Sequence, residues 1–236
     1  MMKKAVLFDY DDTLENFAPA EAVADVFIAE QIQKHYDIAP RDFLKEYNNV
    51  KVNRIHKGSQ SEEYSRILWI TEVLSELGKR PEYGVVDSIV EGYWRVIAKE
   101  AKLFPNTITV LNKLGKKYKL AMISDSDGHK RIKDERLKKI GITKYFDLIV
   151  TSDDTGYDKP DKRVFLYTCD KLGVHPKECI MVGDSPKRDL MTPKRLGMTT
   201  VWTTECLRRD APQKWVDYEI SEIGELWGII ELITKK

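Results

Sequence analysis

The sequence has few of the residues that stabilise small secreted proteins or bind transition metals. Only three cysteines occur among 236 residues, and no CxxC pair is present. An odd number of scattered cysteines argues against a disulfide framework or a zinc knuckle and is typical of a reducing compartment. The four histidines lie far apart and lack the spacing of metal ligands. We therefore expect a cytoplasmic protein whose fold depends on neither disulfides nor zinc.

Long apolar runs and a surplus of one charge are also missing. No stretch approaches the roughly 18 apolar residues of a membrane-spanning helix, and the run 5–8 is too short for a signal peptide. The 39 basic and 38 acidic residues leave a formal net charge of +1. This balance gives no electrostatic reason to bind nucleic acid or a membrane surface, so we expect neither partner. The sequence leaves open whether the protein is a monomer or a homodimer.

What the sequence does contain is a repeated pattern of short apolar runs and helical segments. With 42% apolar residues, the chain has enough material for a sizeable core. Buried strands are predicted at 120–124, 148–151, 179–183 and 199–202, with a further candidate at 216–220. Helical segments lie between them and end at Gly141, Gly173 and Gly197. Repeated strand–helix–strand units predict an α/β fold, a Rossmann-like doubly wound parallel sheet with helices on both faces.

The strand at 5–8 is separated from this pattern by a long helical region. Apolar side chains recur with helical spacing in three segments. The first begins with Val23, Val26 and Phe27, the second extends from Tyr64 to Leu77, and the third extends from Val86 to Ile97. We therefore expect an α-helical cap domain, residues 17–103, inserted into an α/β core made of residues 1–16 and 104–236. The linkers are expected near 14–18 and 101–105.

Polar and charged side chains follow four of the predicted strands. In a parallel sheet, ligands bind at the carboxyl ends of the strands, so these side chains form one cluster if the strands are neighbours. Several carboxylates in one place require a cation, and hard oxygen ligands suit Mg²⁺, which also binds phosphate. Lysine and hydroxyl groups suit a tetrahedral anion, and a carboxylate can act as a nucleophile. The candidate residues are Asp9, Asp11, Thr13, Ser124, Asp125, Lys159, Asp184 and Asp189.

Each of these residues also has an ordinary structural explanation. Asp9 and Asp11 could belong to a solvated turn, and Asp184 and Asp189 could cap a helix at its N-terminus. A lysine in a loop is usually solvated. The occurrence of all four groups, each behind a predicted strand, favours a functional site.

The segments FDYDDTL, MISDSDG, DKPDKRVF and MVGDSPKRD resemble, in order and spacing, the four-motif signature of the haloacid dehalogenase-like hydrolase superfamily. The helical insertion after the first segment resembles the helical cap of the first cap class in position and texture. The resemblance implies a Mg²⁺-dependent phosphatase that hydrolyses a small phosphorylated metabolite through an aspartyl-phosphate intermediate. It also implies that the cap opens and closes over the site and selects the substrate.

The resemblance implies a role for each acid of the first segment. Asp9 would attack phosphorus, and Asp11 would protonate the leaving oxygen and then activate water. The two lie two residues apart, so an extended chain would point both to the same side. Mg²⁺ would be held by the carboxylates of Asp9 and Asp184 and by the backbone carbonyl of Asp11. Asp12 stands where many relatives have glycine, and it has no catalytic role in this scheme.

The remaining candidates would bind and orient the phosphoryl group. Thr13 would orient the first loop, and Ser124 and the backbone amide of Asp125 would hold phosphate oxygens. Lys159 would offset the negative charge between nucleophile and phosphate. Asp189 resembles a carboxylate beside the metal or at an additional metal position.

Three other functions fit the same fold. A 2-haloacid dehalogenase lacks an acid at the position of Asp11, since a departing halide needs no proton, so Asp11 disfavours this reading. A phosphomutase would share Asp9, Asp11 and Mg²⁺, and would need cap contacts that shield the phosphoenzyme from water. A non-catalytic binding protein of the same fold is disfavoured by the intact motifs. The sequence does not identify the phosphorylated substrate.

Overall fold

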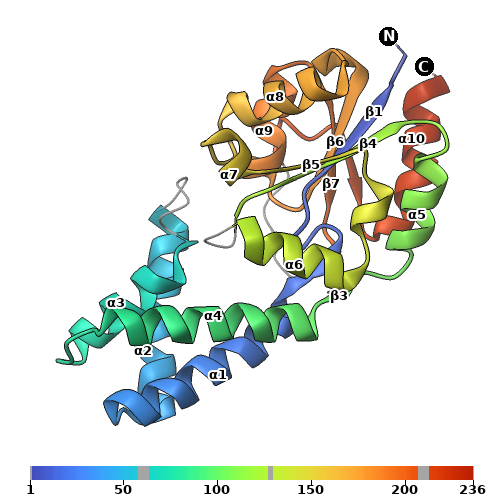
Figure 1. Cartoon of the computed structure of the whole chain (residues 1–236). Helices are drawn as coiled ribbons and strands as arrows, with labels where there is room; N and C mark the ends of the chain where they lie inside the picture. Colours follow the sequence, from blue (N-terminus) through green and yellow to red (C-terminus); the bar gives the residue numbers. More distant parts are fainter. Residues whose placement is uncertain (1, 58–63, 127–129, 207–212, 236) are drawn as a thin grey trace. The chain divides into compact units, whose positions relative to one another are not determined.

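The computed structural model describes residues 2–57, 64–126, 130–206 and 213–235. The chain divides into two compact units (Figure 1). The α/β unit comprises Met1–Asn16, Lys102–Ser126 and Leu137–Lys236, and the helical unit comprises Phe17–Ala101 and Asp127–Arg136. The expected division differs from this one at residues 102–103, which it assigned to the cap, and at residues 127–136, which it assigned to the core. Ile132 of this segment packs against the apolar core of the helical unit.

The α/β unit is built on a six-stranded sheet with the order β5-β4-β1-β6-β7-β8, in which all pairs are parallel. The strands are β1 (Ala5–Phe8), β4 (Lys119–Ser124), β5 (Leu148–Thr151), β6 (Cys179–Gly183), β7 (Thr199–Thr203) and β8 (Tyr218–Ile220). The chain runs outward from β1 to β4 and β5 and then returns to β6 on the other side of β1. This topology confirms the predicted Rossmann-like sheet and puts a switch point at β1, where such folds bind ligands.

Alternation along β1 divides the core of this unit into two layers. Val6 and Phe8 belong to one apolar cluster, and Ala5 and Leu7 belong to the other. Helices α5 (Thr107–Leu114) and α10 (Leu226–Lys235) cover the first face, and α8 (Lys162–Leu172) and α9 (Met191–Arg195) cover the second (Figure 1). The remaining elements are α6 (Lys130–Ile140), which belongs to this unit from Leu137 on, η2 (Thr143–Tyr145), α7 (Ser152–Thr155), η3 (Pro176–Glu178), η4 (Pro186–Leu190) and η5 (Ile223–Glu225).

The helix ends predicted from glycine are confirmed. Gly141, Gly173 and Gly197 follow α6, α8 and α9 and have φ values of 75°, 64° and 86°. This left-handed conformation is the one that terminates helices and that glycine adopts without steric cost.

The segment that precedes α1 pairs with the segment that follows α4. Strand β2 (Glu15–Asn16) is antiparallel to β3 (Lys102–Leu103), with Glu15 opposite Leu103. The Phe104 N–H donates to the Leu14 carbonyl at 3.0 Å. These two connecting segments therefore lie side by side as a short ribbon.

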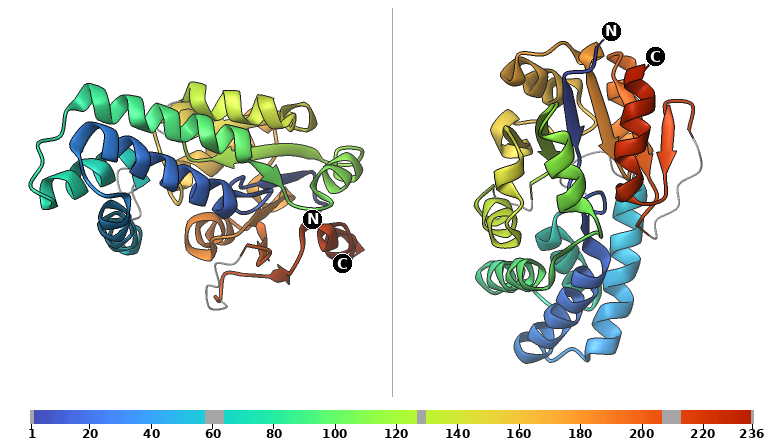
Figure 2. Two further views of the ribbon diagram at one scale, coloured as in Figure 1. Left: turned by 90° about the horizontal axis from the view of Figure 1, so that it is seen from below. Right: turned by 90° about the vertical axis from the view of Figure 1, so that its right-hand side faces the viewer.

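The helical unit consists of α1 (Phe17–Tyr36), α2 (Pro40–Lys57), α3 (Arg66–Glu76) and α4 (Tyr83–Glu100), together with the first turns of α6. Helices α1 and α4 run side by side (Figure 2). A Cβ atom on Gly92 of α4 would lie 2.5 Å from the ring of Phe27, so the glycine permits this close packing. The apolar face predicted for α4 is confirmed, since its buried side chains are Val86, Ile89, Val90, Tyr93, Trp94 and Ile97.

Two details predicted for the other helices are wrong. Val23 and Val26 of α1 are 48% and 50% exposed, and the small residues Ala20 and Ala24 face the core instead. A helix that packs closely against its neighbours can bury alanine more easily than valine, so large aliphatic residues were a poor guide here. In α3, Leu68 is partly exposed while Trp69 is buried. Among the described residues, no helix has the length and apolar character needed to cross a membrane.

Candidate active site

The carboxyl end of β1 lies in the middle of the sheet. Phe8 pairs with Met122 of β4 on one side and with Val182 of β6 on the other. The Asp9 N–H donates to the Val182 carbonyl at 2.9 Å, which extends the pairing by one residue. Asp9 therefore leaves the sheet between the ends of β4 and β6, where two further candidate segments begin.

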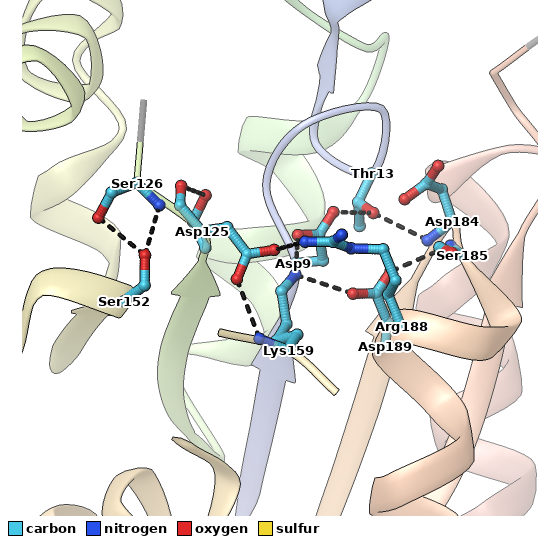
Figure 3. A network of polar contacts seen from close by, with 11 residues as sticks. Asp9, Thr13, Asp125, Ser126, Ser152, Lys159, Asp184, Ser185, Arg188 and Asp189 are labelled. Atoms are coloured by element: carbon cyan, nitrogen blue, oxygen red, sulfur yellow. Dashed lines mark hydrogen bonds and ion pairs between the residues drawn. The ribbon is translucent and has the colours of Figure 1, made fainter. Parts of the chain in front are cut away.

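The Asp9 carboxylate is buried and accepts a hydrogen bond on each oxygen (Figure 3). Lys159 Nζ donates to Asp9 Oδ1 at 2.5 Å, and Thr13 Oγ1 donates to Asp9 Oδ2 at 2.8 Å. The same Lys159 Nζ donates to Asp189 Oδ1 at 2.8 Å. The lysine ammonium thus lies between the carboxylates of Asp9 and Asp189, which are 180 residues apart in the sequence.

The loop after β1 folds Thr13 back towards Asp9. The N–H groups of Thr13 and Leu14 donate to the Tyr10 carbonyl at 3.2 and 2.9 Å. Asp12 has a φ of 59°, a left-handed conformation that aspartate tolerates better than most residues. The left-handed backbone at residue 12 is one that both glycine and aspartate can adopt, which explains why aspartate is tolerated there.

Asp11 is half-buried in the same loop, and its backbone forms a bridge with Glu15. Strand β1 ends at Phe8, so both acids lie beyond the strand, and their orientation to the same side stays a prediction. The turn geometry, rather than an extended chain, determines where Asp11 lies. The role of Asp11 as an acid and base stays a prediction.

Asp184 is held through its backbone by the loop after β1 and by β7. Its N–H donates to Thr13 Oγ1 at 3.0 Å, and its carbonyl accepts from the Trp202 indole Nε1 at 2.8 Å. The Cys206 thiol lies 3.8 Å from Asp184 Oδ2. Thr13 therefore connects Asp9 to Asp184 directly, while Trp202 and Cys206 are neighbours that the sequence did not reveal.

Asp189 projects from a π-helical turn, η4, in which the Met191 N–H donates to the Pro186 carbonyl. Its Oδ2 accepts from the Ser185 N–H at 3.0 Å. A Cβ atom on Gly183 would lie 2.5 Å from the Cβ of Asp189, so the glycine leaves the space that Asp189 occupies. The segment GDSPKRD therefore contains the end of β6, the close approach of Asp189 to Gly183 and the π-helical turn η4.

The site carries more negative charge than its lysine offsets. Burial raises the pKa of Asp189 to about 6 even though Lys159 lies beside it. Burial alone would lower the pKa of Lys159, but Asp189 and Asp9 outweigh it and hold this pKa above its ordinary value, so the ammonium stays charged.

Oxygen atoms of Asp9, Asp184 and Asp189 lie within 4.8 Å of one another, an arrangement that could hold a metal ion. Carboxylate oxygens in this number fit a hard cation such as Mg²⁺. A bound cation would also offset the surplus of negative charge. The donor set is therefore compatible with the expected metal.

Ser124 and Asp125 end β4 on the other side of Asp9. Ser124 is buried, and its Oγ donates to the Asp125 carbonyl at 3.3 Å. Asp125 Oδ1 accepts from the Lys159 main-chain N–H at 3.1 Å, and Oδ2 forms an ion pair with Arg188 (Figure 3). Burial alone would raise the pKa of Asp125, but Lys159 and Arg188 hold it below its ordinary value.

Arg188 is a site neighbour that sequence reasoning missed. The only signal was a basic residue directly before Asp189, and Lys187 beside it is equally basic. The next contacts outward join Ser126 to Ser152, whose Oγ accepts from the Ser126 N–H at 2.8 Å. Polar contacts at the carboxyl ends of the strands thus connect all the candidate segments.

Comparison with known proteins adds relatives that match nearly the whole chain. A family model described as haloacid dehalogenase-like hydrolase matches residues 6–203. The chain is 27% identical to the ribulose-1,5-bisphosphate 5-phosphatase of Halopiger xanaduensis, over 97% of this chain and 100% of the relative. It is 30% identical to the glyceraldehyde 3-phosphate phosphatase of Methanothermobacter thermautotrophicus, again over 97% and 100%.

A solved structure supports the same fold. The HAD-hydrolase YfnB of Bacillus subtilis, solved with bound magnesium, matches with a TM-score of 0.78 at 21% identity. The match covers 98% of this chain and 100% of that one. A likeness of this extent shows that the two proteins share a fold.

Proposed function

The chain belongs to the haloacid dehalogenase-like hydrolase family and is one of its phosphatases, and we propose that it hydrolyses a small phosphorylated metabolite through an aspartyl-phosphate intermediate with Mg²⁺ as cofactor. The observation that carries this proposal is the buried Asp9 carboxylate, with Lys159 Nζ at 2.5 Å from one oxygen and two further carboxylates close by. An acid in this setting can attack an electrophile because a cation and a hydroxyl hold its orientation.

The reaction has two steps. In the first, an Asp9 oxygen attacks phosphorus while the bond to the leaving oxygen breaks, and Asp11 donates a proton to that oxygen. In the second, Asp11 takes a proton from water as the water attacks the phosphorus of the aspartyl phosphate. Inorganic phosphate leaves and the Asp9 carboxylate is restored. Acid–base help of this kind is worth about 10²- to 10⁴-fold in rate.

Phosphate binding falls to Ser124, Asp125 and Lys159. The Ser124 hydroxyl and the Asp125 main-chain amide would donate hydrogen bonds to phosphoryl oxygens, and the Lys159 ammonium would offset the charge between Asp9 and phosphate. Phosphoryl transfer is catalysed mainly by positioning and electrostatic stabilisation, so these donors should contribute much of the rate. The Thr13 hydroxyl links Asp9 to Asp184, because it donates to the Asp9 carboxylate and accepts from the Asp184 N–H.

Mg²⁺ would be held by the carboxylates of Asp9 and Asp184 and by the Asp11 backbone carbonyl. When bound, it would neutralise charge on the phosphoryl oxygens. Asp189 would act from beside it, since its two oxygens already accept from Lys159 and from the Ser185 N–H. YfnB, which has the same fold, holds magnesium.

The substrate class is supported by the relatives. Their names assign them ribulose-1,5-bisphosphate and glyceraldehyde 3-phosphate, which are small sugar phosphates. We propose a sugar phosphate or another small phosphorylated metabolite for this chain. A panel of sugar, triose and nucleoside phosphates, ranked by kcat/KM, will identify the class.

The test is phosphate release from p-nitrophenyl phosphate, with Mg²⁺ and after its removal by EDTA. We expect release only with Mg²⁺. Chloride release from 2-haloacids without metal would instead support a dehalogenase.

A further inference from the structure

Arg188 makes an ion pair in the active site that the mechanism above does not use. Its Nη2 contacts Asp125 Oδ2, and the two side chains are 17% and 24% exposed. A carboxylate of the site therefore offsets the charge of Arg188. It is also the residue directly before Asp189, which contacts Lys159.

These contacts close a ring through three segments of the site (Figure 3). Asp125 Oδ1 accepts from the Lys159 main-chain N–H, and the Lys159 side chain reaches Asp189 Oδ1. Asp189 directly follows Arg188 in the sequence, and the Arg188 guanidinium forms the ion pair with Asp125 Oδ2 that completes the ring. The ring therefore joins the end of β4, the Lys159 loop and the turn η4.

The π-helical turn allows two adjacent residues to take part. Residues of a π-helix turn through a smaller angle per residue than those of an α-helix, so Arg188 and Asp189 can both project towards the sheet edge. Such turns are frequent at functional sites. Lys187, one residue earlier, is exposed.

We propose that Arg188 is a positioning residue: by fastening the Asp125 carboxylate to the turn η4, it holds the Asp125 amide and Lys159 in place beside Asp9. This inference rests on the proposed function, since Asp125 and Lys159 are its phosphate-binding groups. Arg188 acts through Asp125 and does not itself contact the phosphoryl group. A small displacement of such groups can cost about 10²-fold in rate.

The test is a double-mutant cycle with Arg188→Gln, Asp125→Asn and the combined variant, assayed with p-nitrophenyl phosphate. Lys187→Gln is the matched control, because it removes the same charge one residue away. We expect each single variant to lower kcat by about 10²-fold and the combined variant to be no worse than either. Arg188→Lys should restore part of the loss, since lysine keeps the charge but lacks the planar donor fork. Melting temperatures are measured for every variant to identify those that fail to fold.

Inhibition by inorganic phosphate separates positioning from direct contact. If Arg188 acts through Asp125, both single variants weaken phosphate inhibition. If Arg188 contacts phosphate, Arg188→Gln weakens inhibition while Asp125→Asn, which removes a competing negative charge from beside the guanidinium, strengthens it, and this result would overturn the proposal. Independent effects that multiply in the combined variant, or an Arg188→Gln enzyme as active as Lys187→Gln, would also overturn it. The proposed function fails separately, if Asp9→Asn retains full activity.

Discussion

Buried charges occur at several single residues of this protein, and each has charged or polar neighbours that offset the cost of its burial. Lys159 lies between Asp9 and Asp189 in the active site. In the helical unit, Arg66 donates to Glu21 Oε1 at 2.8 Å and to the Tyr93 hydroxyl at 3.0 Å. Removing one member of such a group leaves an uncompensated charge, which destabilises a protein more than the pair stabilises it.

Asp25 is a residue whose burial makes stability depend on pH. Burial raises the pKa of Asp25 from 3.8 to about 6, although Lys51 at 3.3 Å opposes this shift. The raised pKa means that the folded state favours the protonated acid. The stability from this proton is complete below about pH 4 and is lost as the pH rises through about 6.

We expect Asp25→Asn to raise the free energy of unfolding at pH 7.5 by about 1–3 kcal/mol, because the neutral amide avoids the cost of a buried carboxylate. The advantage should disappear at pH 4, and urea unfolding at both values measures it. Asp87→Asn, at an exposed position of α4, is the control. A stabilisation by Asp25→Asn that is equal at both pH values would contradict the assignment.

Neighbouring strand ends support one another at the scale of secondary-structure elements. The Trp202 indole at the end of β7 donates to the backbone carbonyl of Asp184 at the end of β6. Thr13 accepts from the N–H of the same residue. The two contacts hold a proposed metal ligand from both sides of its backbone.

We expect Trp202→Phe to weaken Mg²⁺ binding by about 10- to 100-fold, since contacts that orient a ligand commonly have this effect on metal affinity. Calorimetric titration with Mg²⁺ in the absence of substrate measures it. Trp215→Phe is the matched control, because the Trp215 indole N–H has no hydrogen-bond partner within the described part of the chain. Equal Mg²⁺ affinity in the two variants would show that Trp202 does not orient Asp184.

The elements that the sequence predicted well are those with a strong local pattern. Apolar runs identified every strand of the large sheet, and α4 showed its buried face in its spacing. Helix α2 was not identified as a separate helix, because only a few side chains such as Phe43, Tyr47 and Val50 bury apolar surface. Arg188 and Trp202 were missed because their contacts depend on a π-helical turn and on which strand lies beside β6. Neither feature has a local signature.

Two units with separate apolar cores make up the whole molecule. The core of the helical unit contains Trp69, Tyr93 and Trp94, and Arg66 stacks over the Trp69 ring with 4.3 Å between the guanidinium carbon and the ring centroid. The sheet has its own two clusters. A defect in one core is therefore expected to affect mainly that unit.

We expect Arg66→Met to destabilise the helical unit by about 3 kcal/mol, since Glu21, which also pairs with Lys51, loses a buried cationic partner. Hydrogen exchange should accelerate in α1, α3 and α4 and remain slow in β1, β4 and β6. Arg95→Gln removes an exposed ion pair with Glu91 and should cost less than about 0.5 kcal/mol. Equal acceleration in the sheet would mean that the two units unfold together.

The central claim is that Asp9 carries the phosphoryl group during turnover. It is tested most directly by acid-quenching the enzyme during Mg²⁺-dependent hydrolysis of a phosphorylated substrate and mapping the modified peptide by mass spectrometry. Asp9→Asn tests the nucleophile, and Asp12→Asn, which keeps the left-handed backbone, is the control in the same loop. We predict a phosphoryl group on Asp9 in the wild type and in Asp12→Asn, and neither phosphoryl group nor phosphate release in Asp9→Asn. A phosphoryl group on another residue, or full activity of Asp9→Asn, would contradict the mechanism.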